Sequence, residues 1–348
     1  MKRSYPFFSY LINNKKVLYI PIVSCINRDT QEYDLGADGN VNRFITTFSL
    51  CNEFHSLDIV LPKKHVAGSE NILEMFKTSK INFVWAENFG IHAGEQRRDN
   101  KVIDSVYELT KDIEFDVCIF ESQGLGLKLM DKYKGQGKMF MFWNPVSATE
   151  TKTRIFLEGY EEINKQVCEL CDYMIVASPD QIKYYSSREY SKYKLIYLDK
   201  LIYRNLTCFS YEVDNELVEK YKGKTIYYLP FRLTDEGYKF DKVLEYLEKQ
   251  DGDFVVLYSD PNNSHVVEKL DSKIKEKFDK VSSNRNTYYT ILDHIPCTIL
   301  YFEDLEFINH AAIHEFMSDK CKSKVILYKQ DNNPYDVFSC DRITNINF

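Results

Sequence analysis

The chain has 348 residues, with 45 Lys and Arg against 52 Asp and Glu, so its formal net charge is −7. Hydrophobic residues make up 44% and charged residues 28%, which excludes a disordered chain and fits a globular protein with two domains. The acidic balance also excludes a surface dominated by phosphate contacts, but it leaves room for a local basic groove that binds a nucleotide or DNA.

The start of the chain, Met1–Tyr10, has no long apolar core, and no run of about 18 apolar residues follows. We therefore expect no signal peptide, no membrane span and a cytoplasmic location, which is the host cytoplasm if the protein is viral. The nine cysteines form no regular framework, and Cys168-x-x-Cys171 has no partner pair. We expect reduced structural cysteines and no metal site.

Apolar runs alternate with amphipathic segments along the first half, which is typical of α/β architecture. Strands are expected, in chain order, at Lys16–Ser24, Leu57–Leu61, Ile81–Trp85, Phe115–Glu121, Lys138–Trp143 and Tyr173–Ala177. Helices are expected at Val41–Phe54, Asn71–Thr78, Lys101–Thr110, Leu125–Tyr133 and Ile155–Cys171, with another beginning at Pro179. Pro21 predicts a bulge or an end within the first strand.

The same alternation restarts in the second half, after the polar and irregular segment Asn205–Gly223. Strands are expected at Thr225–Leu229, Phe254–Tyr258, Thr298–Tyr301 and Lys324–Tyr328, and helices at Asp241–Lys249, Val267–Lys280 and Asn309–Phe316. The sequence thus predicts a Rossmann-like domain over 1–204, a linker over 205–223 and a second Rossmann-like domain over 224–348. Ligands of such sheets collect at the carboxyl ends of the strands.

Two cations lie just after the first strand of the second domain, in the stretch YYLPFRLTDEGYKFD (227–241). Arg232 follows the strand, a polar turn with a glycine comes next, and Lys239 precedes the expected helix. Two cations near a helix N-terminus form a plausible clamp for a diphosphate.

This stretch resembles the segment that opens the second domain of retaining glycosyltransferases of family 4, although Phe231 replaces the usual Gly and the Lys lies beyond Gly237. The resemblance implies a GT-B architecture, in which two Rossmann-like domains face each other across a cleft. It also implies that Arg232 and Lys239 neutralise the leaving diphosphate of a nucleotide sugar, which makes both residues candidates for catalysis and for donor binding.

A second resemblance to that family lies over residues 299–328. Glu315 matches the second of its two glutamates, which implies that Glu315 holds the ribose of the donor, whereas Phe307 occupies the position of the first. Asn309 and His310 are expected to cap this helix and to present backbone N–H groups to phosphate.

In the first half, Gly36 and Gly39 lie in the loop 35–43 and allow close backbone approach to an anion. The loop resembles the glycine loop of GT-B transferases and lacks the full GxGxxG pattern, so a dinucleotide oxidoreductase fits poorly. Asn144 follows the strand Lys138–Trp143, at a place where related enzymes carry a His or Asp that faces the acceptor, so we take it as a catalytic candidate.

The resemblance implies transfer of a sugar from a nucleotide diphosphate sugar, with a UDP-sugar favoured, to a hydroxyl acceptor. It implies retention of configuration, no metal and no permanently bound cofactor. Glu121 and Ser122, followed by Gly124 and Gly126, end another strand and are expected to line the acceptor cleft.

The favoured acceptor is a hydroxymethylated pyrimidine in double-stranded DNA, because the chain resembles bacteriophage DNA glycosyltransferases in length and composition. Such an enzyme needs a basic groove and access to an extruded base. The basic candidates are Lys63-Lys64-His65, Arg97-Arg98 and Lys152-x-Arg154. Three alternatives remain: a bacterial surface-glycan or lipid-linked acceptor, a non-catalytic binding protein on the same fold, and a sugar epimerase.

Overall fold

The computed structural model describes residues 5–23, 26–27, 30–35, 41, 54–66, 80–91, 93–143, 160–176, 179–198, 211–230, 233, 239–260, 265–302, 316, 320–328 and 341–346. The chain forms two compact units, Met1–Tyr203 and Arg204–Phe348. Each unit contains its own parallel β-sheet and its own hydrophobic core.

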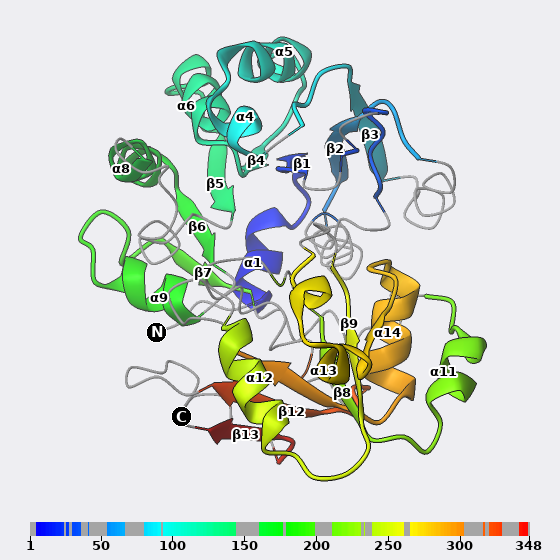
Figure 1. The fold of residues 1–348 in the computed structure, drawn as a ribbon. Coiled ribbons are helices and arrows are strands. Elements are labelled where there is room, and N and C mark those ends of the chain that lie inside the picture. Colours follow the sequence, from blue (N-terminus) through cyan, green and yellow to red (C-terminus); the bar gives the residue numbers. More distant parts are fainter. Residues whose placement is uncertain are drawn as a thin grey trace. The chain divides into compact units, whose positions relative to one another are not determined.

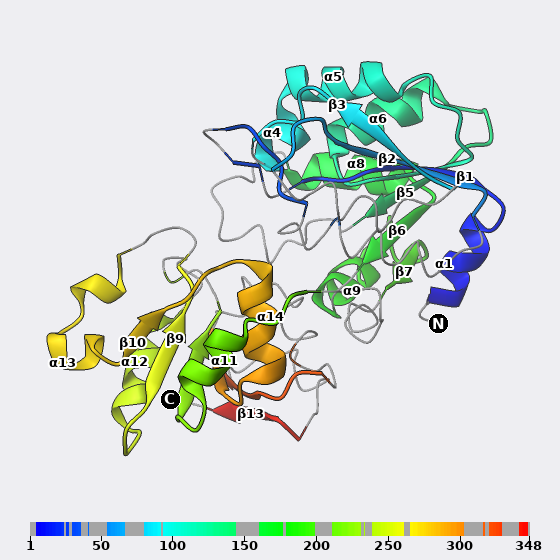
Figure 2. The same cartoon turned by 90° about the vertical axis from the view of Figure 1, so that its right-hand side faces the viewer.

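The first unit is built on a sheet of seven parallel strands in the order β3-β2-β1-β4-β5-β6-β7 (Figure 1). The strands are β1 Lys16–Ile20, β2 Ser56–Pro62, β3 Ile81–Ala86, β4 Val117–Phe120, β5 Met139–Trp143, β6 Tyr173–Val176 and β7 Leu195–Tyr197. Its helices are α1 Tyr5–Ile12, α4 Ala93–Arg98, α5 Asn100–Thr110, α6 Gln123–Lys132, α8 Tyr160–Leu170 and α9 Pro179–Ser186. Figure 2 shows α4, α5 and α6 together over one face of this sheet.

Burial on both faces explains why these strands are continuous apolar runs. All four residues of β4 are buried, and the Phe120 ring stacks on Phe142 of β5 with 5.5 Å between the ring centroids. Pro21 follows the last residue of β1, which confirms that the first strand ends there. Helix α6 begins with a cap, because the Ser122 hydroxyl accepts a hydrogen bond from the Leu125 N–H.

The order of the strands reverses beside β1. Strand β1 pairs with β2 on one side and with β4 on the other. Strands β2 and β3 extend the sheet from one side of β1, and strands β4 to β7 extend it from the other. In open parallel sheets, ligands bind outside the carboxyl ends of the strands at such a switch point. The first unit therefore has one preferred ligand position, between the ends of β1 and β4.

The second unit repeats this plan with six parallel strands in the order β10-β9-β8-β11-β12-β13. The strands are β8 Ile226–Leu229, β9 Val255–Tyr258, β10 Phe278–Lys280, β11 Thr298–Tyr301, β12 Lys324–Tyr328 and β13 Ile343–Ile346. The helices are α11 Asn215–Tyr221, α12 Phe240–Glu248, a 3-10 turn at Val267–Lys269, α13 Ser272–Lys275 and α14 Arg285–His294. Its switch point lies between β8 and β11.

The single helix predicted over Val267–Lys280 is wrong. Leu270 ends the first turn with an extended backbone, and α13 adds only one further turn. Phe278 then pairs with Val256 as the start of the edge strand β10. The three residues of β10, Phe-Asp-Lys, form no apolar run and none of them is buried, so the sequence carries no strand pattern there.

The segment 205–223 was expected to be irregular, and it contains α11. Asp214 caps this helix by accepting a hydrogen bond from the Leu217 N–H at 2.9 Å, and the Tyr221 hydroxyl donates to the Asp279 carboxylate at 2.6 Å. These contacts make α11 part of the second unit. The helices expected at Val41–Phe54, Asn71–Thr78 and Asn309–Phe316 lie almost wholly outside the described residues.

Candidate functional site

The second unit places Lys239 at its switch point. The Lys239 backbone N–H donates a hydrogen bond to the carbonyl oxygen of Phe302 at 2.8 Å, and Phe302 directly follows β11. Lys239 is also the N-cap residue of α12, where its side chain makes no capping hydrogen bond. Lys239 is a half-buried residue, and its backbone lies where the α12 N-terminus meets the end of β11, a position that favours anions.

Two buried polar residues follow the neighbouring strand β9 in the same unit. Ser259 is 5% and Asp260 is 7% exposed, and the Ser259 N–H donates to the Leu229 carbonyl oxygen at 3.3 Å. Leu233, in the connection from β8 to α12, is buried in the core. Leu233 and Lys239, two described residues of this connection, are thus each held against the second unit.

Most other residues expected at the site lie outside the described part of the chain. They are Gly36, Gly39, Asn144, Arg232, Asn309, His310 and Glu315. Their assignments stay predictions, and Lys239 is the one member of the predicted donor set that the described residues include.

In the first unit, Glu121 lies at the switch point between β1 and β4. Its carboxylate accepts a hydrogen bond from the Tyr19 hydroxyl at 2.8 Å and another from the Ile22 N–H at 3.0 Å. The residue is only 4% exposed. A buried carboxylate is stable when donors of this kind face it, so Glu121 joins the ends of the two strands and fixes the backbone after Pro21.

Gln96 and Gln123 lie in the same polar cluster as Glu121, and no motif in the sequence marks either glutamine. The Gln96 side chain accepts from the Val23 N–H and donates to the Val23 carbonyl oxygen, both at 2.9 Å. The Ser122 hydroxyl donates to the Gln96 carbonyl oxygen at 2.8 Å. Because Gln96 lies 73 residues from Val23 in the chain, no local sequence pattern links them.

Gln123, the first residue of α6, is the exception in this cluster. It is 2% exposed, and among the described residues neither its amide nitrogen nor its amide oxygen has a hydrogen-bond partner. An unsatisfied buried amide costs on the order of 1–3 kcal/mol, so this position needs a reason. The N-terminus of α6 and the switch point beside it are where this unit is expected to take a ligand.

The glycines after Ser122 have different surroundings. A Cβ atom on Gly126 would overlap the buried ring of Phe120, so Gly126 lets α6 pack directly on β4. A Cβ on Gly124 would meet the terminal methyl of Ile103 at 2.7 Å. Close packing of α6 on the sheet therefore accounts for Gly126, and close packing of α6 on α5 accounts for Gly124.

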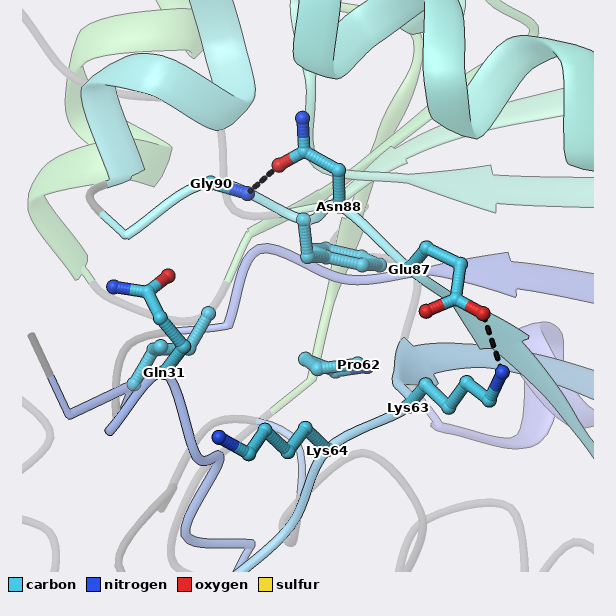
Figure 3. Close-up of a pocket in the computed structure, with 9 residues that line it drawn as sticks. Gln31, Pro62, Lys63, Lys64, Glu87, Asn88 and Gly90 are labelled. Carbon is cyan, nitrogen blue, oxygen red and sulfur yellow. Dashed lines mark hydrogen bonds and ion pairs between the residues drawn. The ribbon is translucent and has the colours of Figure 1, made fainter. Parts of the chain in front are cut away.

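A pocket of about 440 Å³ lies further out on the same edge, at the carboxyl ends of β2 and β3 (Figure 3). Its lining residues are Ile26, Gln31, Pro62, Lys63, Lys64, Glu87, Asn88, Phe89 and Gly90. The volume falls in the range of small-molecule sites, about 300–1,000 Å³. Two of the predicted basic residues, Lys63 and Lys64, thus contribute to one concave surface.

The other predicted basic residues are not part of this pocket. The His65 ring packs edge-on against Trp85, with 4.9 Å between centroids. Arg97 and Arg98 end the short helix α4, and Lys152 and Arg154 lie outside the described residues.

The cysteines that the structure describes are buried and unbridged: Cys118, Cys168, Cys171, Cys297 and Cys321. Burial raises the pKa of the Cys171 and Cys297 thiols to about 12, so both are protonated and unreactive near neutral pH. Within the described ranges, no group of His, Cys, Asp and Glu side chains is arranged to hold a metal ion. No helix in those ranges is long and apolar enough to span a membrane.

Comparison by sequence finds no relative for this chain, since no family model and no curated protein matches it. Solved structures do match. Sucrose-phosphate synthase from Thermosynechococcus elongatus superposes with a TM-score of 0.64 at 13% identity, over 95% of this chain and 86% of that one.

Two further matches are structures determined with nucleotide sugars. HepE of Anabaena, in complex with UDP-glucose, has a TM-score of 0.62 at 8% identity, over 95% of this chain and 85% of HepE. UGT89C1 of Arabidopsis thaliana, in complex with UDP-L-rhamnose, has a TM-score of 0.57 at 10% identity, over 96% of this chain and 86% of that one. The two parallel-sheet units and these matches along nearly the whole chain show that the protein has the GT-B fold, with two Rossmann-like α/β units.

Proposed function

We propose that this protein is a glycosyltransferase that takes its sugar from a nucleotide diphosphate sugar, with a UDP-sugar favoured. The observation that carries the proposal is the presence of two parallel sheets, each with its own switch point, in the GT-B fold. The similar structures HepE and UGT89C1 were determined with UDP-glucose and UDP-L-rhamnose. Because fold alone does not fix function, the charged and polar groups at the two sheet edges supply the further support for this activity.

The donor belongs to the second unit in this proposal. Lys239 supplies a cation at the start of α12, and Arg232 supplies a second one eight residues before helix α12 begins. Together they stabilise charge on the departing diphosphate, an interaction that grows as the glycosidic bond breaks. Glu315 holds the ribose, while Asn309 and His310 present backbone N–H groups to phosphate, as the family resemblance implies.

The acceptor belongs to the first unit. Here Glu121 and Gln96 fix the backbone after β1, and Gln123 offers both an amide donor and an amide acceptor at the start of α6. A hydroxyl is itself a donor and an acceptor, so the Gln123 amide is suited to orient the attacking hydroxyl. Asn144, one residue after β5, completes the proposed acceptor side.

The acceptor that we propose is a hydroxymethylated pyrimidine in DNA, reached after the base is extruded. Its support is the sequence resemblance together with the two lysines of the pocket beside β2. A surface-glycan or lipid-linked acceptor is the rival within the same reaction class. Retention of configuration and independence of metal are further parts of the proposal, taken from the resemblance to family 4.

A thermal-shift screen with UDP, GDP, UDP-glucose and GDP-mannose tests the donor half of this proposal. We expect stabilisation by one nucleotide series and its loss in the variant Arg232→Ala. Transfer assays on hydroxymethylcytosine DNA, matched unmodified DNA and a glycan acceptor test the acceptor half, and the anomeric proton of the product reports retention or inversion. A non-catalytic binding protein would give a donor shift without product, and an epimerase would convert the donor without an acceptor.

A further inference from the structure

The pocket at the ends of β2 and β3 lies beyond the switch point of the first unit, and the proposed function cites its two lysines without saying which part of an acceptor the pocket binds. We propose that it binds a phosphate-bearing sugar unit of the acceptor, with the phosphate at Lys64. This inference rests on the proposed function, because it assumes that the first unit holds the acceptor. It names the part of the acceptor that lies outside the reacting centre.

The walls of the pocket are tied together by backbone hydrogen bonds. The Lys63 N–H donates to the Ala86 carbonyl oxygen at 2.9 Å, which extends the pairing of β2 and β3 beyond the strands. The Tyr33 N–H donates to the Lys64 carbonyl oxygen at 2.8 Å, and Tyr33 is fully buried. The turn before Tyr33 is therefore fixed against the end of β2, and the pocket needs little rearrangement to bind a ligand.

The third wall is a turn that holds Gln31 in a strained conformation. Gln31 has a φ of 59°, a left-handed value that is unfavourable for a residue other than glycine. Its N–H donates to the Asn27 carbonyl oxygen at 2.9 Å, and the Asn27 N–H donates to Glu32 at 2.9 Å. Strain of this kind concentrates where a side chain must be held toward a ligand.

The two lysines of the pocket differ in whether a carboxylate neutralises their charge. The Lys63 ammonium forms an ion pair with the Glu87 carboxylate, so these two charges cancel. The Lys64 ammonium donates to the neutral Thr30 carbonyl oxygen at 2.5 Å, and within the described residues no carboxylate pairs with it. In Figure 3 the two lysine side chains point to opposite sides of the pocket, Lys63 toward Glu87 and Lys64 toward Gln31.

One uncompensated cation selects one anionic group at the Lys64 end. The Lys63–Glu87 pair at the other end offers donors and acceptors for sugar hydroxyls. The floor between them includes Pro62 and Phe89, both buried and apolar, which suits the carbon face of a ring. A phosphorylated sugar has this sequence of groups, whereas a neutral sugar leaves the Lys64 charge without a partner.

The same chemistry has two sources, the deoxyribose phosphate of DNA and the sugar phosphate of a glycan precursor. Isothermal titration of the full-length chain with glucose 6-phosphate, 2′-deoxycytidine 5′-monophosphate and glucose separates them. We expect at least one phosphate probe to bind and glucose to bind more weakly. Preference for the deoxynucleotide supports the inference with DNA as the source, and preference for glucose 6-phosphate supports it with a glycan precursor.

Three variants make the test specific to the pocket. Lys64→Gln should weaken the phosphate probe by about tenfold, because it removes a charge-assisted contact. Glu87→Gln should tighten the same probe severalfold, because it removes a repelling carboxylate and releases Lys63. Lys111→Gln is the control for the loss of one surface ammonium, since Lys111 pairs with Glu108 of α5 and does not line the pocket, and it should bind as the wild type does.

The inference is overturned if no phosphate probe binds the wild type at about 10 mM, a level that corresponds to negligible affinity. It is also overturned if Lys64→Gln binds as tightly as Lys111→Gln, provided that both keep the wild-type circular dichroism. UDP binding, measured on the same samples, separates the two proposals. Intact UDP binding with no phosphate binding at Lys64 refutes this inference alone, whereas the reverse result refutes the donor site.

Discussion

The backbone N–H of Lys239 donates to the carbonyl oxygen of Phe302 at 2.8 Å and so joins the start of α12 to the end of β11. The contact holds the helix N-terminus and the strand end together at the switch point of the second unit. It depends on the backbone, so the position of Lys239 does not require its side chain.

Lys239→Ala should therefore remove a cation and leave the helix in place. The Lys239 side chain makes no capping hydrogen bond, so the substitution removes no side-chain cap from α12. We expect UDP to bind about tenfold more weakly, the loss typical of one charge-assisted contact to phosphate. The control is Lys249→Ala, at the C-cap of the same helix, which should bind UDP as the wild type does in equilibrium titration. Equal weakening by both variants would point to a general charge effect.

Gln123→Met should make the protein more stable and less active. Methionine is close to glutamine in size and carries no amide, so it removes two buried polar atoms that lack partners. We expect the free energy of unfolding to rise by about 1–2 kcal/mol in urea denaturation. If Gln123 orients the acceptor, kcat/KM for the acceptor should fall while the affinity for UDP stays constant. A stabilised variant with unchanged transfer kinetics would remove Gln123 from the site.

Glu121→Gln should weaken the junction of β1 and β4. The amide group can accept from only one of the two donors that now face the carboxylate, the Tyr19 hydroxyl and the Ile22 N–H. We expect a loss of about 1–3 kcal/mol, and a smaller loss of about 1 kcal/mol for Tyr19→Phe. A double-mutant cycle measured by denaturation checks this, because two residues in direct contact should show non-additive losses. Additive losses would contradict the pairing.

Asp279 should stabilise the second unit only at pH values at which its carboxyl group is ionised. Burial raises the pKa of this carboxyl, but the hydrogen bonds from Lys220 and Tyr221 outweigh burial, and the pKa lies below its usual value. A folded-state pKa below the unfolded one gives stability that is present above about pH 4 and is lost as the pH falls through the folded value. Asp279→Asn should therefore lower stability at pH 7 and have little effect near the acid end, as denaturation at several pH values would show.

Asp58 provides a control, because its substitution by Asn should change the stability at pH 7 in the opposite direction. Burial raises its pKa, and the hydrogen bond from Asn82 at 3.3 Å offsets this only in part. Ionisation then costs the folded state free energy as the pH rises through the unfolded pKa, so Asp58→Asn should raise stability at pH 7 and not in acid. The same sign of effect for both substitutions at pH 7 would contradict the two pKa directions.

The strands could largely be predicted from the sequence, because a parallel sheet covered on both faces requires short apolar runs such as those of β4 and β11. Edge strands such as β10 lack that signal. The strand order could not be predicted either, since nothing local indicates that β1 lies between β2 and β4.

In the candidate site, too, some features could be predicted from the sequence and others could not. The position of Lys239 at the start of a helix could be predicted because a cation between a strand and a helix is a local pattern, and its role as a donor ligand stays a prediction. The role of Glu121 depends on Tyr19, which lies 102 residues away in the chain, and Gln123 is notable only for the partners that it lacks. Such features become visible only when the fold brings distant segments together.

The central claim is that the second unit binds a nucleoside diphosphate through the cations before α12. Equilibrium titration of UDP into the wild type, Arg232→Ala and Lys249→Ala tests it most directly. We expect saturable binding to the wild type, the same binding to Lys249→Ala, and an affinity at least about tenfold lower for Arg232→Ala. Binding that is equally tight in all three proteins, or no binding of UDP or GDP to the wild type, would contradict it.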